Sequence, residues 1–219
     1  MTETNKIHVL IADDHAIVRE GLKQILADTK DILVAGEAEN GLGAIALARE
    51  NAHCPHHQVM LLDISMPDRN GIDILKQLRK EFPKLAVLML SMHREDQYAI
   101  RALKTGASGY LNKQSAPAEL VDAIRQVASG KKYISPALAQ ELANHINEDH
   151  DAALHEKLSD REYQTMIMIA SGKTVSDIAG ELALSVKTIS MYRARLLQKM
   201  KLRHNAELTH YAIKNKLVD

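Results

Sequence analysis

Four polar side chains stand directly after short apolar segments of the chain. Apolar runs of this kind are typical of buried parallel strands, whose carboxyl ends meet at one edge of a sheet. The segments are residues 7–12, 59–62 and 85–90, and the polar residues that follow them are Asp13, Asp14, Asp63 and Ser91. We therefore expect three carboxylates and a hydroxyl in one crevice, at the edge where α/β proteins bind their ligands.

A crevice with three carboxylates favours a bound cation. Carboxylates that close together raise one another's pKa unless a positive charge compensates them. Oxygen ligands with water in the remaining positions suit Mg²⁺. A fourth apolar segment, residues 109–111, leads to Lys113, whose ammonium could reach the same crevice and favour a bound phosphate. Taken singly, each carboxylate would more often be a helix cap or a turn residue, so the prediction depends on their joint placement.

These motifs resemble the receiver domain of bacterial two-component response regulators over roughly residues 6 to 130. The resemblance is carried by Asp13-Asp14, Leu-Leu-Asp63-Ile-Ser-Met-Pro, Leu90-Ser91-Met-His and Gly-Ala-Ser-Gly-Tyr110-Leu-Asn-Lys113. It implies that Asp63 accepts a phosphoryl group from a sensor histidine kinase. It also implies a switch and not an enzyme, with at most slow self-dephosphorylation.

The resemblance implies roles for the neighbouring residues as well. Asp13, Asp14, Asp63 and the carbonyl of Ser65 would hold Mg²⁺, Ser91 and Lys113 would contact the phosphoryl oxygens, and Tyr110 would change rotamer on activation. One departure is Gln114, because many receivers have a cis proline directly after the lysine. This departure bears only on the geometry of that loop.

Strand-like segments alternate with helical periodicity up to about residue 130. Such alternation is typical of βαβ units, in which helices cover both faces of a parallel sheet. Helices are expected near residues 15–28, 41–50, 71–80, 94–105 and 116–129. We predict an α/β doubly wound five-stranded parallel sheet, a flavodoxin-like receiver. A further helix from Pro136 to about Ile146 is followed by the polar segment 147–151, the best linker candidate.

The remaining residues predict a small all-α helix-turn-helix domain. Ser159 and Glu162 form a capping-box pattern, Gly172 ends that helix, and a second short helix covers 175–182. Ser185 then caps a longer helix that continues to Met200, the arrangement of a helix-turn-helix. Its core face carries Ile189, Leu196, Leu197 and Met200, and the DNA contacts are predicted at Lys187, Thr188, Ser190, Met191, Tyr192, Ala194, Arg195 and Lys199.

Residues 158–217 resemble the LuxR-type helix-turn-helix of the NarL/FixJ class of response regulators. The resemblance is carried by Leu-Ser-Asp-Arg-Glu, Ile178-Ala179 and Val186-Lys187-Thr188-Ile189. It implies a phosphorylation-dependent transcriptional regulator that binds double-stranded DNA, with a homodimer when active. In relatives the last helix, here about 205–214, forms the dimer contact, although its Leu208, Ala212 and Ile213 could equally be core. The predicted domains are 1–130 receiver, 131–154 helix and linker, and 155–219 DNA-binding.

Composition and charge agree with this division. The 219 residues are 46% hydrophobic and carry no net charge, but residues 155–219 hold eleven basic against seven acidic residues. Cys54 is the only cysteine, which excludes an internal disulfide and suits a reducing compartment. No apolar run approaches the ~20 residues that span a bilayer, so we expect a cytoplasmic protein without membrane contact.

Three alternatives compete with these predictions. His53-Cys54-Pro55-His56-His57 contains metal-ligand types, but five contiguous residues around a proline favour the loop before the third strand over a zinc site. Asp63 could be the nucleophile of a hydrolase, although Ser65 stands where a second carboxylate would be expected. The chain could also bind DNA constitutively and use the receiver only to dimerise. The intact set of Asp, Ser and Lys argues against that.

Overall fold

The computed structural model describes residues 6–54, 56–92, 97–115, 117–147, 154–215 and 217–218. These residues belong to two compact units, Met1–Asn144 and His145–Asp219. Most of the predicted linker, residues 148–151, and the predicted start of the helix at 94–96 lie outside the described residues. The domain boundaries predicted at residues 130 and 155 stay a prediction.

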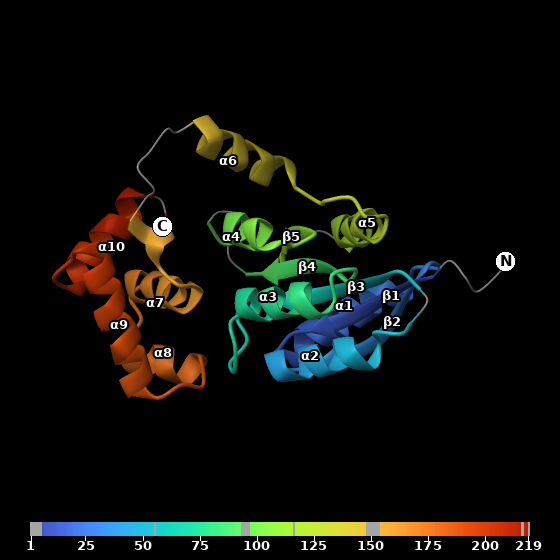
Figure 1. The fold of residues 1–219 in the computed structure, drawn as a ribbon, viewed down its shortest axis with the longest axis horizontal. Coiled ribbons are helices and arrows are strands. Elements are labelled where there is room, and N and C mark those ends of the chain that lie inside the picture. Colours follow the sequence, from blue (N-terminus) through green and yellow to red (C-terminus); the bar gives the residue numbers. More distant parts are fainter. Residues whose placement is uncertain are drawn as a thin grey trace. The chain divides into compact units, whose positions relative to one another are not determined.

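The first unit contains one parallel sheet (Figure 1). Its strands lie in the order β2-β1-β3-β4-β5, and every neighbouring pair is parallel. This is the flavodoxin-like strand order, so the predicted doubly wound five-stranded sheet is confirmed. The strands are β1 (Ile7–Ala12), β2 (Ile32–Ala38), β3 (Gln58–Asp63), β4 (Ala86–Ser91) and β5 (Gly109–Asn112).

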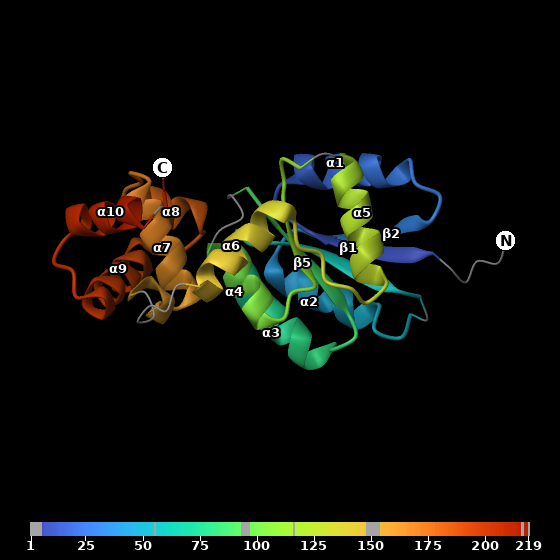
Figure 2. The same cartoon turned by 90° about the horizontal axis from the view of Figure 1, so that it is seen from above.

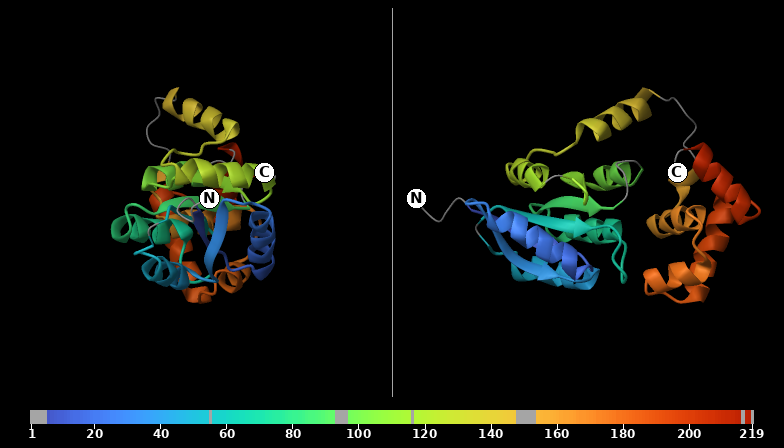
Figure 3. Two further views of the ribbon diagram at one scale, coloured as in Figure 1. Left: turned by 90° about the vertical axis from the view of Figure 1, so that its right-hand side faces the viewer. Right: turned by 180° about the vertical axis from the view of Figure 1, so that it is seen from behind.

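Helices cover both faces of the sheet (Figures 2 and 3). The helices α1 and α5 pack on one face, where their leucines and isoleucines meet alternate residues of all five strands. The helices α2, α3 and α4 contact one another in sequence and lie on the other face. The bounds are α1 (Ala16–Ala27), α2 (Gly41–Glu50), α3 (Gly71–Glu81), α4 (Gln97–Thr105) and α5 (Pro117–Ala128).

The three central strands are buried on both faces, which explains their continuous apolar sequence. Val9–Ala12 of β1 and Val59–Leu62 of β3 have no exposed side-chain surface. A strand covered by helices on both sides cannot alternate polar with apolar residues. Strand β2 lies at the edge, and several of its side chains remain partly exposed.

The helices after β5 match the predicted pattern closely. Helix α6 (Pro136–Asn147) begins at the predicted proline. The second unit consists of η2 (Leu154–Lys157), α7 (Asp160–Ala170), α8 (Val175–Glu181), α9 (Val186–Met200) and α10 (Asn205–Lys214). Ser159 and Glu162 form the predicted capping box of α7, and Gly172 has the left-handed φ of +87° that ends it. No described helix is long and apolar enough to cross a bilayer.

The turn after β3 brings two backbone segments into close contact at Gly71. A Cβ atom added there would lie 2.2 Å from the carbonyl oxygen of Asp63 and 2.7 Å from the Cα of Ile64. The Gly71 N–H also donates to the carbonyl oxygen of Ile64 at 2.9 Å. Backbone atoms cannot move aside as a flexible side chain can, so the position of Asp63 depends on the absence of a side chain at Gly71.

Gly71→Ala should therefore lower the free energy of unfolding of the first unit by about 1–3 kcal/mol, through overpacking against backbone. The matched control is Gly21→Ala in the middle of α1, where an added Cβ meets nothing within 4 Å. That control should raise the free energy by about 0.5–1 kcal/mol. Urea unfolding of both variants checks the pair, and a Gly71→Ala chain as stable as the parent would contradict the close contact.

Candidate functional site

Two buried carboxylates lie side by side at the carboxyl edge of the sheet. Asp63 is the last residue of β3 and is 1% exposed, and Asp13 directly follows β1 and is fully buried. Strands β1 and β3 are hydrogen-bonded neighbours, with Ala12 opposite Leu62. The predicted meeting of these strand ends is therefore present, and we call Asp13, Asp14 and Asp63 the acidic pocket.

Lys113 supplies one positive charge to this pocket. Its Nζ lies 2.7 Å from Asp13 Oδ2 and 3.1 Å from Asp63 Oδ1, and its side chain is only 5% exposed. A buried ammonium needs such partners, because an unpaired charge out of water is costly. The structure thus brings Lys113 together with both carboxylates, as the sequence predicts.

The backbone after β5 holds Lys113 in place. The Lys113 N–H donates to the carbonyl oxygen of Ser91 at 2.7 Å, which ties it to β4. The Gln114 N–H donates to Asn112 Oδ1 at 2.8 Å, an Asx turn around the lysine. No peptide bond among the described residues is cis, so the Lys113–Gln114 bond is trans. The Asn112 turn therefore shapes this loop, where many receivers have a cis proline.

Burial dominates the electrostatics of Asp63. Loss of hydration raises the pKa of this carboxyl to about 6, the nearby Lys113 lowers it, and Asp13 raises it. A hydrogen bond from the Ser65 backbone N–H lowers it further. The Asp63 carboxyl therefore keeps a raised pKa even beside the Lys113 ammonium, and further positive charge in the pocket would lower that pKa.

The acidic pocket fits a divalent cation. Oxygen atoms of Asp13, Asp14 and Asp63, with the ring of His15, offer ligand atoms within 4.8 Å of one another. Asp63 Oδ2 is buried and has no hydrogen-bond partner in the described structure. Such an orphaned carboxylate oxygen is what a hard cation with oxygen ligands would satisfy. The predicted role of the Ser65 carbonyl stays a prediction.

The two other predicted residues of the receiver lie nearby and inside the fold. Ser91 is the last residue of β4 and is 1% exposed, on the strand beside β3. Tyr110 of β5 is fully buried. Its ring thus already occupies the interior, the position that we expect it to take when the switch is active.

Two residues at this edge were missed by the sequence reasoning. The His15 N–H donates to Asp13 Oδ1 at 3.0 Å, and its ring Nδ1 lies 2.8 Å from Asp14 Oδ1. Asp68 accepts hydrogen bonds from the Gly41 and Leu42 N–H groups, and so ties the turn after β3 to the start of α2. His15 directly follows the paired aspartates, a signal that was available, whereas the Asp68 contact spans 27 residues of sequence.

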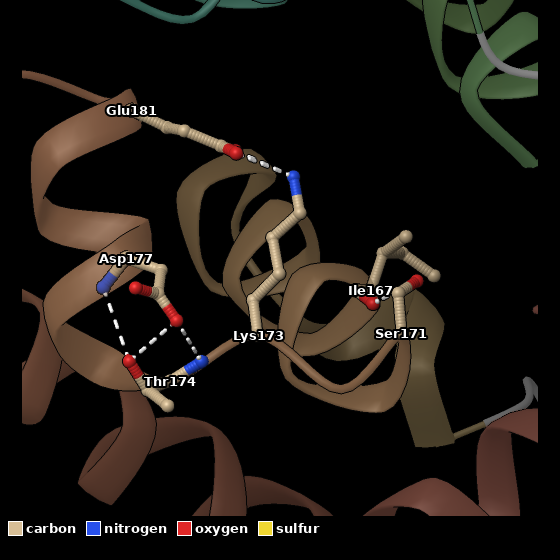
Figure 4. A network of polar contacts seen from close by, with 6 residues as sticks. All are labelled: Ile167, Ser171, Lys173, Thr174, Asp177 and Glu181. Carbon is tan, nitrogen blue, oxygen red and sulfur yellow. Dashed lines mark hydrogen bonds and ion pairs between the residues drawn. The ribbon is translucent and has the colours of Figure 1, made fainter.

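The helix-turn-helix consists of α8 and α9. The Thr174 Oγ1 accepts from the Asp177 N–H at 3.2 Å, and Asp177 Oδ2 accepts from the Thr174 N–H at 3.0 Å (Figure 4). Lys173, which precedes α8, pairs with Glu181 at the end of that helix, with 2.6 Å between Nζ and Oε2 (Figure 4). Ala183 takes the left-handed φ of 50° in the turn, and Ser185 caps α9. These contacts fix α8 and the start of α9.

Helix α9 has the two faces that were predicted. Its expected core residues Ile189, Leu196, Leu197 and Met200 are buried. Of the predicted DNA contacts, Thr188 and Tyr192 are half-buried, and the exposed ones are Lys187, Ser190, Met191, Ala194, Arg195 and Lys199.

Two of these predicted contacts have intramolecular partners. The Lys199 Nζ lies 2.6 Å from Glu162 Oε2, and Glu162 is only 4% exposed. Burial would raise the pKa of Glu162, but the Lys199 and Ser159 hydrogen bonds outweigh it and hold the pKa below its ordinary value. The Thr188 hydroxyl lies 2.8 Å from the Ser185 hydroxyl at the cap. Lys199 and Thr188 therefore contribute to the fold as well as to the exposed surface.

The raised pKa of Asp63 predicts a pH-dependent stability difference between the parent chain and Asp63→Asn. Between the unfolded pKa of 3.8 and the folded value of about 6, the folded state binds the proton more tightly. The parent chain's stability from this group is therefore present below pH 4 and lost as the pH rises through 6. Without divalent metal, Asp63→Asn should gain about 2–3 kcal/mol relative to the parent between pH 4 and pH 7. Urea unfolding in chelator measures this, and a pH-independent difference would refute it.

Both parts of the chain match known families. The model of the response regulator receiver domain matches residues 9–125, and that of the luxR family of bacterial regulatory proteins matches residues 156–212. The chain is 39% identical to the response regulator UvrY of Escherichia coli K12, over 96% of the chain and 95% of that protein. It is 37% identical to the response regulator GacA of Pseudomonas aeruginosa, over 97% and 98%.

A solved structure with the same architecture is RcsB of Salmonella enterica serovar Typhimurium bound to the promoter rprA with a phosphomimetic BeF₃⁻. Its TM-score is 0.65 at 27% identity, covering 94% of the chain and 98% of RcsB. With the predicted fold, the acidic pocket and the helix-turn-helix all present, the chain belongs to the NarL/FixJ-class response regulators and is a phosphorylation-dependent transcriptional regulator that joins a receiver to a LuxR-type DNA-binding domain.

Proposed function

We propose that Asp63 accepts the phosphoryl group, delivered by a sensor histidine kinase. The observation that carries this proposal is the buried Asp63 carboxylate, whose Oδ2 has no hydrogen-bond partner in the described structure while its Oδ1 lies 3.1 Å from Lys113. In the reaction an Asp63 oxygen forms a bond to phosphorus as the phosphorus–nitrogen bond of the donor phosphohistidine breaks. The electron pair of that bond leaves with the donor imidazole.

The acidic pocket would hold Mg²⁺ through Asp13, Asp14, Asp63 and the carbonyl of Ser65. When bound, the ion compensates the negative charge of the carboxylates and of the incoming phosphoryl group. His15 stays outside this ligand set, because Mg²⁺ prefers oxygen to imidazole nitrogen. The side chain of His15 is 63% exposed and is thus free to turn away.

Lys113 and Ser91 are assigned to the phosphoryl oxygens. Lys113 already contacts the Asp63 carboxylate, so its ammonium is held where a phosphoryl group of about −1.5 to −2 charge would form. The Ser91 hydroxyl belongs to the strand beside Asp63. No carboxylate stands two residues after Asp63, where Ser65 lies, so the chain offers no base there for water. We accordingly propose a switch that loses its phosphoryl group slowly and not a hydrolase.

Phosphorylation would act through β4 and β5. Movement of Ser91 toward the phosphoryl oxygens would stabilise the buried position that the Tyr110 ring already occupies, and would thereby bias the surface formed by α4 and β5. Couplings of about 1–3 kcal/mol are sufficient to shift such an equilibrium several-fold to a hundredfold. DNA binding would rise either because α9 is uncovered or because the chain dimerises.

On double-stranded DNA we propose a homodimer that places α9 of each copy in the major groove. The luxR family match supports the DNA-binding part, and RcsB has been solved as dimers on DNA. Lys187, Arg195, Thr188, Tyr192 and Lys199 are assigned to phosphates, and Ser190, Met191 and Ala194 to the bases. In α10, Leu208 and Ala212 are buried while Ile213 is 53% exposed, so Ile213 is the apolar residue left for a dimer contact.

The proposed domains are 1–130 receiver, 131–154 helix and linker, and 155–219 DNA-binding, and the proposed site of action is the cytoplasm, where the DNA target is found. The matched families and the single cysteine support this assignment.

Asp63→Asn should abolish phosphorylation by acetyl phosphate in Mg²⁺, because an amide oxygen cannot form the acyl phosphate. The intact mass of the chain after incubation measures the added group. Asp73→Asn, which removes an exposed carboxylate of α3, is the matched control and should be phosphorylated as the parent is. Phosphorylation of Asp63→Asn at the rate of the parent would contradict the assignment.

A DNA affinity that does not change with acetyl phosphate would instead favour constitutive DNA binding.

Lys187→Ala should weaken DNA binding at every sequence. It should also make the negative slope of log K against log salt less steep by about 0.9, the value for one phosphate contact. Fluorescence anisotropy at several salt concentrations measures the slope. Lys80→Ala removes one exposed positive charge from α3 of the receiver and should leave the slope unchanged. Equal slopes for the parent and Lys187→Ala would remove Lys187 from the contact set.

A further inference from the structure

A second cluster of metal-ligand types lies at the opposite edge of the sheet from the acidic pocket. His8 of β1, with Cys54 and His56 of the connection between α2 and β3, offers three ligand atoms within 4.8 Å of one another. All three side chains are half-buried. His8 and Asp13 are five positions apart along the chain, about 16 Å at the usual rise of a strand, so this cluster is distinct from the acidic pocket.

The sequence alone could not reveal this cluster. The contiguous residues 53–57 lack the second, separated ligand group that zinc sites usually have. The fold supplies it, because His8 pairs with Gln58 across β1 and β3 and so lies beside the loop. The loop does lead into β3, as predicted, and Pro55 lies outside the described residues.

One pair of ligand atoms already has the separation of a metal site. The Cys54 Sγ and His8 Nδ1 atoms are 3.5 Å apart. Tetrahedral bonds of about 2.3 Å to sulfur and about 2.0 Å to nitrogen put the two ligand atoms about 3.5 Å apart. The His8 and His56 rings are stacked with centroids 4.3 Å apart and their ligand atoms lie within 4.8 Å, so His56 would reorient its ring to point a nitrogen at the same ion.

The backbone holds this arrangement together. The His8 N–H donates to the carbonyl oxygen of His57 at 2.9 Å, which fastens the loop to β1. The side-chain amide of Gln58 (Nε2) and the backbone N–H of Cys54 both donate to the carbonyl oxygen of Asn51, at 2.5 and 3.0 Å. A loop fixed at both ends loses little conformational freedom when an ion binds, which favours affinity.

We propose that His8, Cys54 and His56 form a binding site for a thiophilic divalent ion such as Zn²⁺. Two imidazoles and one thiolate are ligands for borderline-soft ions and not for Mg²⁺. Because the three side chains are half-buried, water can take the fourth position. Bound metal would join the amino-terminal ends of the neighbouring strands β1 and β3.

Cobalt(II) absorption of the full chain tests this proposal, with no histidine tag, a non-chelating reductant and excess Mg²⁺. The parent should show a thiolate-to-cobalt charge-transfer band that Zn²⁺ abolishes by displacement, and Cys54→Ser should lack it. His8→Asn and His56→Asn should each weaken Zn²⁺ binding at least about tenfold. Even the loss of a residue that only supports a metal ligand lowers metal affinity about 10- to 100-fold. His53→Asn, an exposed histidine of the same loop, is the matched control and should bind as the parent does.

The design separates this site from the acidic pocket and from loss of fold. Asp63→Asn should keep the band, because oxygen ligands give no thiolate transition. Far-ultraviolet circular dichroism without metal should be unchanged in Cys54→Ser. The proposal is overturned if the parent shows no band, if Cys54→Ser binds Zn²⁺ as tightly as the parent, or if His53→Asn loses binding while His8→Asn keeps it. Cys54 and His8 would then share only a thiol–imidazole hydrogen bond.

Discussion

The pairing of two buried carboxylates with one ammonium is the interaction on which the site depends. Asp13 and Asp63 share Lys113 at 2.7 and 3.1 Å, and Asp14 lies beside them. Three acidic groups against one basic group leave a net demand for positive charge in a place with little water. Burial, with a smaller contribution from the neighbouring Asp13, raises the pKa of Asp63 in spite of Lys113. A divalent cation and then a phosphoryl group are natural occupants of such a pocket.

The parallel sheet, with its interior strands buried on both faces, brings these charged side chains close together. Strands covered on both faces contribute no polar side chain until they end, so the first polar residues of β1 and β3 emerge at the same edge. Gly71 then lets the following loop pass directly against the Asp63 backbone. Stability of the core and placement of the Asp63 carboxylate are thus consequences of one arrangement, and a change that loosens the turn would disturb both.

Sequence patterns predicted what depends on local periodicity and missed what depends on tertiary partners. The central strands, the capping box of α7 and the bounds of α9 follow from apolar runs and caps, and all are confirmed. Edge strand β2 could not be delimited, because it mixes exposed and buried residues around Gly36. Lys199 could not be recognised as the partner of Glu162, since no helical pattern indicates a contact 37 residues away. The approach of His8 to Cys54 was hidden for the same reason.

The position of Lys113 suggests how charge in the pocket becomes movement elsewhere. Its ammonium divides its contacts between Asp13 and Asp63, with the shorter distance to Asp13. A phosphoryl group on Asp63 would offer stronger acceptors than either carboxylate, so the ammonium would leave Asp13 for the new oxygens. The Lys113 N–H is bonded to the Ser91 carbonyl and the turn around Lys113 is held by Asn112, so a shift of this side chain would act on β4 and β5 together. Ser91 and Tyr110 belong to those two strands, so we propose that rearrangement of this one ion pair is what alters the surface of α4 and β5.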